Sequence, residues 1–394
     1  MLPIIPFNRP YAVGTECDYI RQTVENMHCS GDGPFSRKCE ALLEELLGAP
    51  KVLLTTSCTD ALEMQALLLD IGPGDEVIVP SFTFVSTANA FALRGAKIVL
   101  ADVRPDTLNL DESQLERLIT PRTRAIAVVH YAGVACEMDE ILDIARRHGV
   151  PVLEDNAHGL FGRYKGCNLG TLGPLAAQSF HETKNISCGE GGALVLNDPQ
   201  YIDRAEILRE KGTNRSRFFR KQVDKYTWVD VGSSFLPSDV LAAFLFAQLE
   251  ARQSIQAARR RVWEYYAERL REWSMVFSVQ MPVVPDHCEQ SYHMFYLLLG
   301  GIEERDAFIE HLERQRVSAV FHYVPLHLSE MGRRFGGCPG GCPVTEDVSN
   351  RIVRLPFYNT LTAPLQDRVI DAVLSFDFNR RAVHVPRRPI RKAG

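Results

Sequence analysis

Short apolar runs, rich in β-branched residues, alternate with helix-like stretches through the first 200 residues of the chain. Runs of this length between helical patterns are typical of βαβ units, whose strands form a mostly parallel sheet covered on both faces. The expected helices include residues 59–69 and 137–148. The expected strands are residues 51–55, 76–80, 97–102, 124–130, 151–155, 176–180 and 192–196. The pattern therefore predicts one large α/β domain.

The periodicity changes after residue 250. Ile255, Val262 and Tyr266 recur at helical spacing and predict a long helix over residues 251–273. A strand at 292–300 and a helix at 305–315 then predict a smaller α+β domain. We expect a large domain at 1–250, including an N-terminal arm, and a small domain at 251–378. The basic segment 379–394 is predicted to be a disordered tail, which we favour over a site for an anionic partner.

Charge and cysteine content exclude some classes of protein. The 394 residues contain 44 Lys and Arg against 49 Asp and Glu, a net charge of −5, which argues against a general nucleic-acid binder. No apolar run reaches the roughly 18 residues of a membrane helix, and residues 1–10 lack the apolar core of a signal peptide. The ten cysteines are irregularly spaced, so we expect free thiols in a cytoplasmic protein. Cys338 and Cys342 have no second ligand pair nearby, and we expect a surface loop without metal.

Polar residues follow two of the predicted strands. Thr56 to Thr59 come directly after the first strand, at the start of a helix. Such a helix start binds phosphate in many proteins, although an ordinary helix cap looks the same. Asp155 ends the fifth strand, where it either caps the next turn or holds a cationic ring nitrogen of a cofactor. His158 then either contacts the same cofactor or packs as a core histidine.

A lysine follows the next strand and precedes a glycine-rich turn. Lys184 lies in the run SFHETKN and is followed by GEGG. A lone lysine is usually a surface residue, but here it comes 29 residues after Asp155. A pyridoxal phosphate enzyme needs a lysine for a Schiff base, an aspartate for the pyridinium nitrogen and a helix N-terminus for the phosphate.

These motifs together resemble those of the DegT/StrS family of sugar-nucleotide aminotransferases, which have the aspartate-aminotransferase-like type I fold. The resemblance covers residues 3–375. It rests on the runs SCTDALEM, PSFTFVSTANA, EDNAHG, SFHETKN and GEGG. Within the family, the runs SGDGPF, VHYAGVACEMD and REKGTNRS are most similar to enzymes that make dTDP-4-amino-4,6-dideoxygalactose.

The resemblance implies a role for each of nine residues. Lys184 carries the cofactor, pyridoxal 5′-phosphate, and then moves the proton, while Asp155 holds the pyridinium nitrogen. The other residues implied to touch the cofactor are His158 at its 3-hydroxyl, Phe84 on its ring, and Cys58, Thr59 and Ser179 at its phosphate. Ser234 stands where many relatives place an asparagine that reaches the partner subunit's cofactor, and the surrounding residues differ from that motif. His322 matches a segment near the sugar.

The implied reaction moves the amino group of L-glutamate to the C4 ketone of dTDP-4-dehydro-6-deoxyglucose. Lys184 favours transamination, because some relatives with histidine there are dehydratases. Transamination at C3 and UDP- or GDP-linked sugars remain open, as do a non-catalytic cofactor-binding protein and a purely structural α/β protein. The resemblance also implies synthesis of a surface polysaccharide, such as enterobacterial common antigen or O-antigen, or of a glycosylated natural product.

The assembly is expected to be a homodimer with sites built from both chains. Residues 235–249 are apolar almost all round, and a helix without a polar face must be buried on most sides. The alternative is a helix buried within its own domain.

Overall fold

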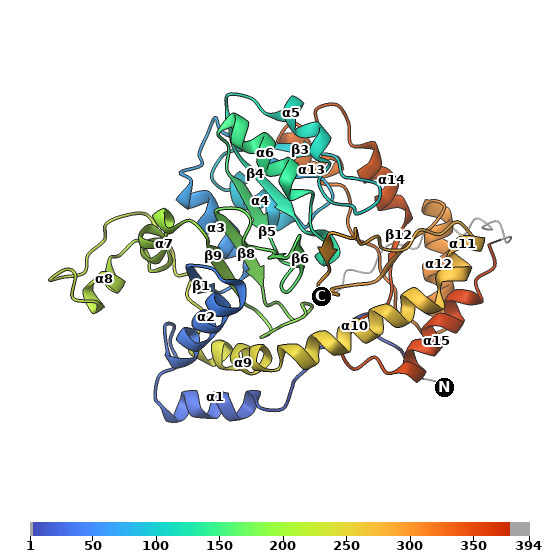
Figure 1. Cartoon of the computed structure of the whole chain (residues 1–394), viewed down its shortest axis with the longest axis horizontal. Helices are drawn as coiled ribbons and strands as arrows, with labels where there is room; N and C mark the ends of the chain where they lie inside the picture. Colours follow the sequence, from blue (N-terminus) through green and yellow to red (C-terminus); the bar gives the residue numbers. More distant parts are fainter. Residues whose placement is uncertain (1–2, 379–394) are drawn as a thin grey trace.

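The computed structural model describes residues 3–378 and has a seven-stranded sheet at its centre (Figure 1). The strand order is β1-β9-β8-β5-β4-β2-β3. β9 runs antiparallel to β1 and β8, and the other neighbours are parallel. The strands are β1 Lys51–Thr55, β2 Glu76–Pro80, β3 Lys97–Ala101, β4 Thr123–Val129, β5 Val152–Asp155, β8 Leu175–Ser179 and β9 Gly192–Leu196. The α/β class is confirmed, and each predicted strand lies within one residue of its expected ends.

Helices cover both faces of this sheet. Along β1, Leu53 packs in one core cluster with α3 (Cys58–Leu68), while Val52 and Leu54 pack in another with α2 (Pro34–Leu47). This two-sided burial explains why the strands are continuous apolar runs. The remaining helices around the sheet are α1 Glu16–Glu25, α4 Val85–Ala92, α5 Leu115–Leu118, α6 Met138–His148, α7 Ile202–Arg209, α8 Arg215–Phe219 and α9 Asp239–Glu250.

A second core lies at the other end of the molecule (Figure 1). Ile5 from the N-terminal arm belongs to it and pairs with Val317, so the proposed division at residue 250 stays a prediction. Its elements are α10 Arg252–Arg269, α11 Arg271–Val276, α12 Ile302–Arg314 and α15 Ala363–Leu374, with β11 Tyr296–Leu298 paired to β12 Ile352–Arg354. α14 Pro343–Arg351 packs against α12, whereas α13 Glu330–Arg334 lies near β3 of the large sheet (Figure 1). The short strands β6 Arg163–Tyr164, β7 Cys167–Asn168 and β10 Cys288–Glu289 form a third sheet.

The prediction of ten free thiols is wrong for one pair. Cys338 and Cys342 form a disulfide with Cα atoms 6.2 Å apart. Gly340 and Gly341 have φ of 94° and 80°, a conformation that favours glycine, so the intervening turn reverses the chain and brings the two thiols together. The predicted tail at 379–394 lies outside the described residues, and none of the helices within residues 3–378 is long and apolar enough to cross a membrane.

The apolar segment 235–249 has an explanation within its own chain. It forms most of α9, which begins after the capping residue Ser238 and packs against α1 and α2. Leu245 and Leu249 are buried in the core cluster beneath it. The hydrophobicity of this helix is therefore explained within one chain, as the alternative proposed, and the homodimer stays a prediction.

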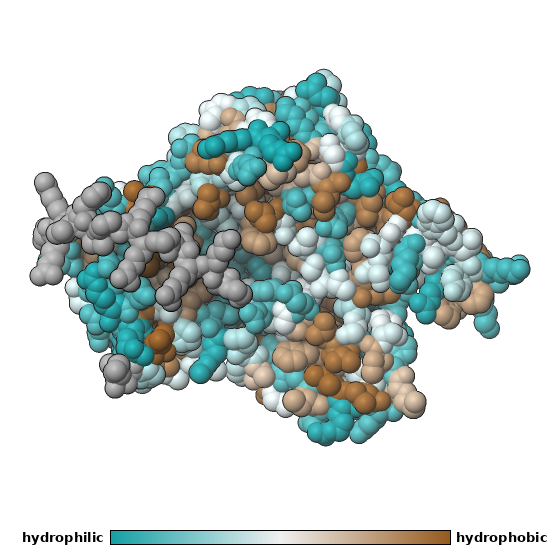
Figure 2. All heavy atoms as spheres, turned by 180° about the vertical axis from the view of Figure 1, so that it is seen from behind, coloured by the Kyte–Doolittle hydropathy of each residue, from teal (hydrophilic) through white to brown (hydrophobic). Residues whose placement is uncertain are grey.

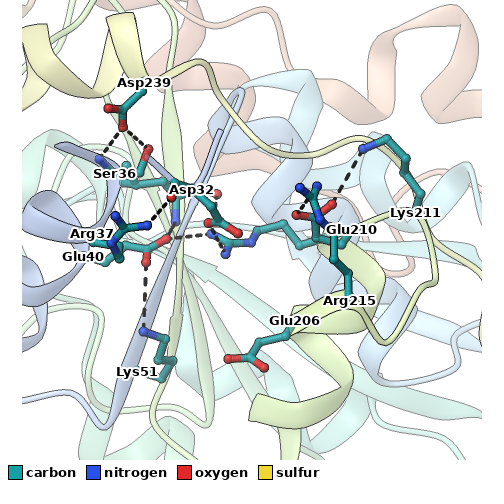
Figure 3. Close-up of polar contacts among 12 residues, drawn as sticks. Asp32, Ser36, Arg37, Glu40, Lys51, Glu206, Glu210, Lys211, Arg215 and Asp239 are labelled. Atoms are coloured by element: carbon teal, nitrogen blue, oxygen red, sulfur yellow. Dashed lines mark hydrogen bonds and ion pairs between the residues drawn. The ribbon is translucent and has the colours of Figure 1, made fainter. Parts of the chain in front are cut away.

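A buried ion-pair network holds the carboxyl end of β1. Arg209 of α7 donates to Glu40 of α2 at 2.6 Å and to Asp32 at 2.8 Å. Glu40 also accepts the N–H of Leu54 at 3.1 Å, and Figure 3 shows it reaching Lys51 at the start of the same strand. Beside it, Ser36 is bonded to Asp239, which joins α2 to α9 (Figure 3). The network thus fixes where β1 passes into residues 56–58.

Replacing Arg209 by methionine should lower the free energy of unfolding by about 3–5 kcal/mol, because Glu40 would remain buried without its partner. Chemical denaturation would measure this change. Arg21→Met is the control, since the Arg21–Asp18 pair is exposed and should contribute less than about 1 kcal/mol. Equal small effects of the two substitutions would contradict the structural role of Arg209.

Candidate active site

The two acidic residues that end β5, Glu154 and Asp155, point to opposite faces of the sheet and make different contacts. Glu154 accepts the N–H groups of Gly170 at 2.8 Å and Gly173 at 2.7 Å. It also accepts the Nε2 proton of His130 at 2.9 Å, because Nδ1 of that ring accepts a backbone N–H. Glu154 is therefore a structural anchor for the loop after β7.

Asp155 lies on the other face, buried at the end of the strand. Its carboxylate accepts the hydroxyl of Thr87 at 2.7 Å and the N–H of Ala157 at 3.2 Å. Burial raises the pKa of Asp155, and the hydrogen bonds from Thr87 and Ala157 oppose that change. Asp155 is thus a held, desolvated acid that would be stabilised as a carboxylate by a cation placed against it.

Lys184 lies beside Asp155 on the loop between β8 and β9. The loop is closed by hydrogen bonds from Lys184 N–H to the His181 carbonyl at 2.9 Å and from Phe180 N–H to the Gly191 carbonyl at 2.8 Å. Desolvation lowers the pKa of Lys184 to about 8, although the neighbouring Cys58 and Asp155 act in the opposite direction. The amine therefore approaches the neutral, nucleophilic form near physiological pH.

The N-terminus of α3 meets the same edge of the sheet. Ser57 caps it by accepting the Asp60 N–H at 3.1 Å, and the first-turn N–H groups of Cys58 and Thr59 have no partner within the helix. A Cβ on Gly192 would come within 2.4 Å of the Cys58 nitrogen, so only glycine permits this approach of β9.

Two of the predicted phosphate ligands stand beside this helix end. Thr59 bonds to Ser86 at 2.9 Å, and Ser179 pairs with Gly192 across β8 and β9. Hydroxyls and free amides at a helix N-terminus suit an anion such as phosphate. Burial raises the pKa of the Cys58 thiol well above its ordinary value, and nearby Asp155 adds to this, so Cys58 stays a neutral thiol.

A cationic residue that the sequence analysis missed lies near Lys184. Arg354, which ends β12, donates to Nδ1 of His322 at 2.8 Å. Desolvation and then Arg354 lower the pKa of His322 to about 4, so its ring is neutral. Within residues 3–378 no carboxylate pairs with Arg354, and its Nε is buried without a partner. Arg354 is therefore available to bind an anion.

The predicted residues His158, Phe84 and Ser234 lie at different distances from this cluster. His158 is buried, and desolvation followed by the charges of Lys184 and Arg354 lowers its pKa well below the ordinary value. Phe84 is 57% exposed, with its ring 6.3 Å from that of Tyr323, which in turn lies near Asp155. Ser234 is exposed, and its backbone forms an isolated antiparallel β-bridge with Glu210. Within residues 3–378 no hydrogen bond joins Ser234 to the cluster.

Sequence reasoning missed Thr87, Tyr323 and Arg354. Thr87 stands within the motif PSFTFVSTANA, one helical turn after Thr83, to which it is also bonded. A signal for Arg354 was present, because this charged residue interrupts the apolar run at residues 352–357. Tyr323 had no such signal, because an aromatic residue in a loop is ordinary.

In the protein without ligand, Lys184 should titrate near pH 8, with the ammonium form below this value and the free amine above it. The rate at which a small amine-acylating reagent modifies Lys184 should therefore rise to a plateau through pH 8. Peptide mapping would follow that site separately, with the exposed Lys211 as internal reference. A midpoint near 10.5, the ordinary lysine value, would contradict the proposed desolvation.

Comparison with known proteins identifies a family and several similar structures. Residues 11–374 match the DegT/DnrJ/EryC1/StrS aminotransferase family. The GDP-perosamine synthase of Caulobacter vibrioides is 36% identical, over 83% of this chain and 86% of its own. The structure of S. venezuelae DesV in complex with a ketimine intermediate is 31% identical and has a TM-score of 0.86, over 95% of this chain and 98% of its own. Spr1654 of Streptococcus pneumoniae, in its PMP form, has a TM-score of 0.86 at 25% identity, over 94% and 96%.

These similarities extend over nearly the whole described chain and confirm the aspartate-aminotransferase-like type I fold. They also agree with the motifs from which the family was predicted. The chain belongs to the DegT/DnrJ/EryC1/StrS aminotransferase family.

Proposed function

We propose that the protein is a pyridoxal 5′-phosphate-dependent aminotransferase that acts on a nucleotide-linked ketosugar. The observation that carries the proposal is the position of Lys184, whose pKa is lowered to about 8, near the buried carboxyl group of Asp155. A structural ion pair would not need an amine so close to neutrality. Family membership and the PMP form of Spr1654 support the same reaction.

The residues present fit this cofactor. Its ring accepts electrons when a bond at the substrate carbon breaks. Lys184 would hold the cofactor through its side-chain amine, and the same amine, once free, would move a proton from the substrate carbon. Asp155 would keep the proton on the ring nitrogen, and the hydroxyl of Thr87 orients that carboxylate. The unpartnered Nδ1 of buried His158 marks a place for a ligand atom.

The remaining predicted contacts complete the proposed site. The N-terminus of α3 would hold the phosphate through the backbone and side chains of Cys58 and Thr59, with the hydroxyl of Ser179 beside them. Phe84 would cover the cofactor ring. Ser234 would act in the partner subunit's site, since among residues 3–378 of one chain no hydrogen bond joins it to the Lys184 cluster.

For the amino donor we propose L-glutamate, with Arg354 as the cation that binds a carboxylate of it. The motive is the position of this guanidinium near Lys184 without a carboxylate partner among the described residues. His322, bonded to Arg354, would then face the substrate.

For the acceptor we propose the C4 ketone of dTDP-4-dehydro-6-deoxyglucose, giving dTDP-4-amino-4,6-dideoxygalactose. The support is the resemblance of the segments at 30–35, 129–139 and 209–216 to enzymes that make this sugar. The similarity to GDP-perosamine synthase favours a GDP-linked sugar as the second candidate. A role in synthesis of a surface polysaccharide stays a prediction.

Steady-state assays with glutamate and a panel of dTDP-, UDP- and GDP-linked 3- and 4-ketosugars test the proposal. The account expects the highest kcat/KM with the dTDP-linked 4-ketosugar. A preference for the GDP-linked sugar would replace the proposed substrate while keeping the reaction. Cofactor binding without turnover on any ketosugar would favour a non-catalytic cofactor-binding protein.

Replacing Asp155 by asparagine should reduce kcat by roughly 10³-fold and weaken cofactor binding, because a neutral amide does not hold the ring proton. Lys184→Ala should abolish turnover while the thermal midpoint of unfolding stays close to that of the wild type. Asp143→Asn, an exposed carboxylate on α6, is the control. Near-normal kinetics in either site variant would remove that residue from the mechanism.

The active unit is proposed to be a homodimer. Exposed apolar side chains support this, including Val24 and Met27 at the end of α1, and Phe219 and Trp228 in and after α8. Figure 2 shows one group of hydrophobic side chains at the lower end of the molecule, where α1 and α9 lie in Figure 1. Light scattering at micromolar concentration should give about twice the chain mass of 44.3 kDa. A fully active monomer at this concentration would contradict a site shared between chains.

A further inference from the structure

Two histidine rings are stacked at the edge of the site. The rings of His158 and His293 lie 4.2 Å apart between centroids, at an interplanar angle of 16°. Both side chains are buried, and His293 comes from the segment between β10 and β11, far from His158 in sequence. A stack of this kind restricts rotation of the His158 ring about its own side-chain bonds. It thereby restricts the direction in which the unpartnered Nδ1 of His158 points.

The protonation of His293 follows from its hydrogen bond to Asn185. The amide nitrogen of Asn185 donates to the Ser291 carbonyl at 2.6 Å and to the side-chain oxygen of Gln256 at 3.2 Å. Its oxygen therefore faces Nδ1 of His293, at 3.0 Å, and accepts a hydrogen bond from the Nδ1–H group. Burial, and then the neighbouring His158 and Lys184, lower the pKa of His293 well below its ordinary value. The ring is thus neutral with its proton on Nδ1.

The segment that carries His293 is fixed from two sides. Arg259 of α10 donates to the Tyr292 carbonyl at 3.0 Å and to the His293 carbonyl at 2.6 Å. On the other side, the hydroxyl of Ser291 donates to the carbonyl of His158. A Cβ on Gly133 would lie 1.9 Å from that hydroxyl, so the approach requires glycine there. His293 is therefore held rigidly against His158 and against the residue that follows Lys184.

We propose that His293 is a positioning residue: its ring fixes the plane of the His158 imidazole toward the cofactor, and its hydrogen bond to Asn185 ties that plane to the loop that carries Lys184. The proposal rests on the proposed function, because it assigns to His158 a contact with pyridoxal phosphate. The charged and titratable groups around the stack are Lys184, Arg354, His322, Arg259 and Tyr131. His293 itself does not touch the reacting atoms in this account.

The test compares cofactor binding by His293→Ala and His293→Phe. Protein freed of cofactor would be titrated with pyridoxal phosphate, following its absorbance and the circular dichroism of its bound band. His293→Ala should weaken binding about 10-fold and reduce the dichroism, because the stack is lost. His293→Phe keeps a ring against His158 and should stay within about 3-fold of the wild type. His287→Ala, a histidine paired with Glu137 away from the cluster, is the matched control and should not change binding.

Each outcome decides the proposal. A His293→Ala protein with wild-type affinity and dichroism, and only a lower melting temperature, would show a merely structural role and overturn it. Equal losses in His293→Ala and His293→Phe would also overturn it, since the ring would then be irrelevant. If His293→Ala does not fold, His293→Gln, which keeps a donor toward Asn185 but no ring, gives the same comparison. Failure of the wild-type protein to bind pyridoxal phosphate would instead refute the proposed function.

Discussion

Desolvation of two opposite charges at one edge of the sheet is the constraint on which the site depends. Asp155 and Lys184 are close enough to attract each other, yet the pKa of the acid is raised and that of the amine is lowered. Burial therefore outweighs their mutual attraction in the protein without ligand. A cationic ring would pair with the Asp155 carboxylate, and a covalent bond to the Lys184 amine would remove its charge. Together they would remove the desolvation cost of both groups. This is the physical reason for regarding the pair as a binding site.

The rest of the fold supplies the rigidity that such an arrangement needs. The Arg209–Glu40 pair fixes the end of β1, and Glu154 fixes the loop after β7 from the opposite face of β5. Thr87 of α4 orients the carboxylate of Asp155, which brings a third element into the site. The active-site side chains thus come from the ends of different strands and loops, while buried polar groups with only structural partners set their positions.

The strands and the residues that end them could be predicted from sequence because their causes are local. A two-sided sheet requires apolar runs, and a polar residue that ends such a run, such as Asp155, is conspicuous. Arg354 and His293 were not predicted, because only the packing of the second core against the sheet brings them close to Lys184 and His158. The paired cysteines at 338 and 342 were missed for a similar reason: the glycine turn between them decides their geometry, and cysteine spacing does not. For the apolar α9 the pattern predicted burial but could not say against which chain.

The central claim is that Lys184 is the residue to which the cofactor is bound. The most direct measurement is to incubate the protein with pyridoxal phosphate, reduce the bond with borohydride, digest the product and locate the modified lysine by mass spectrometry. The account predicts a stoichiometric label on Lys184 and none in the Lys184→Ala protein. A label on another lysine, or no stable label on the wild-type chain, would contradict it.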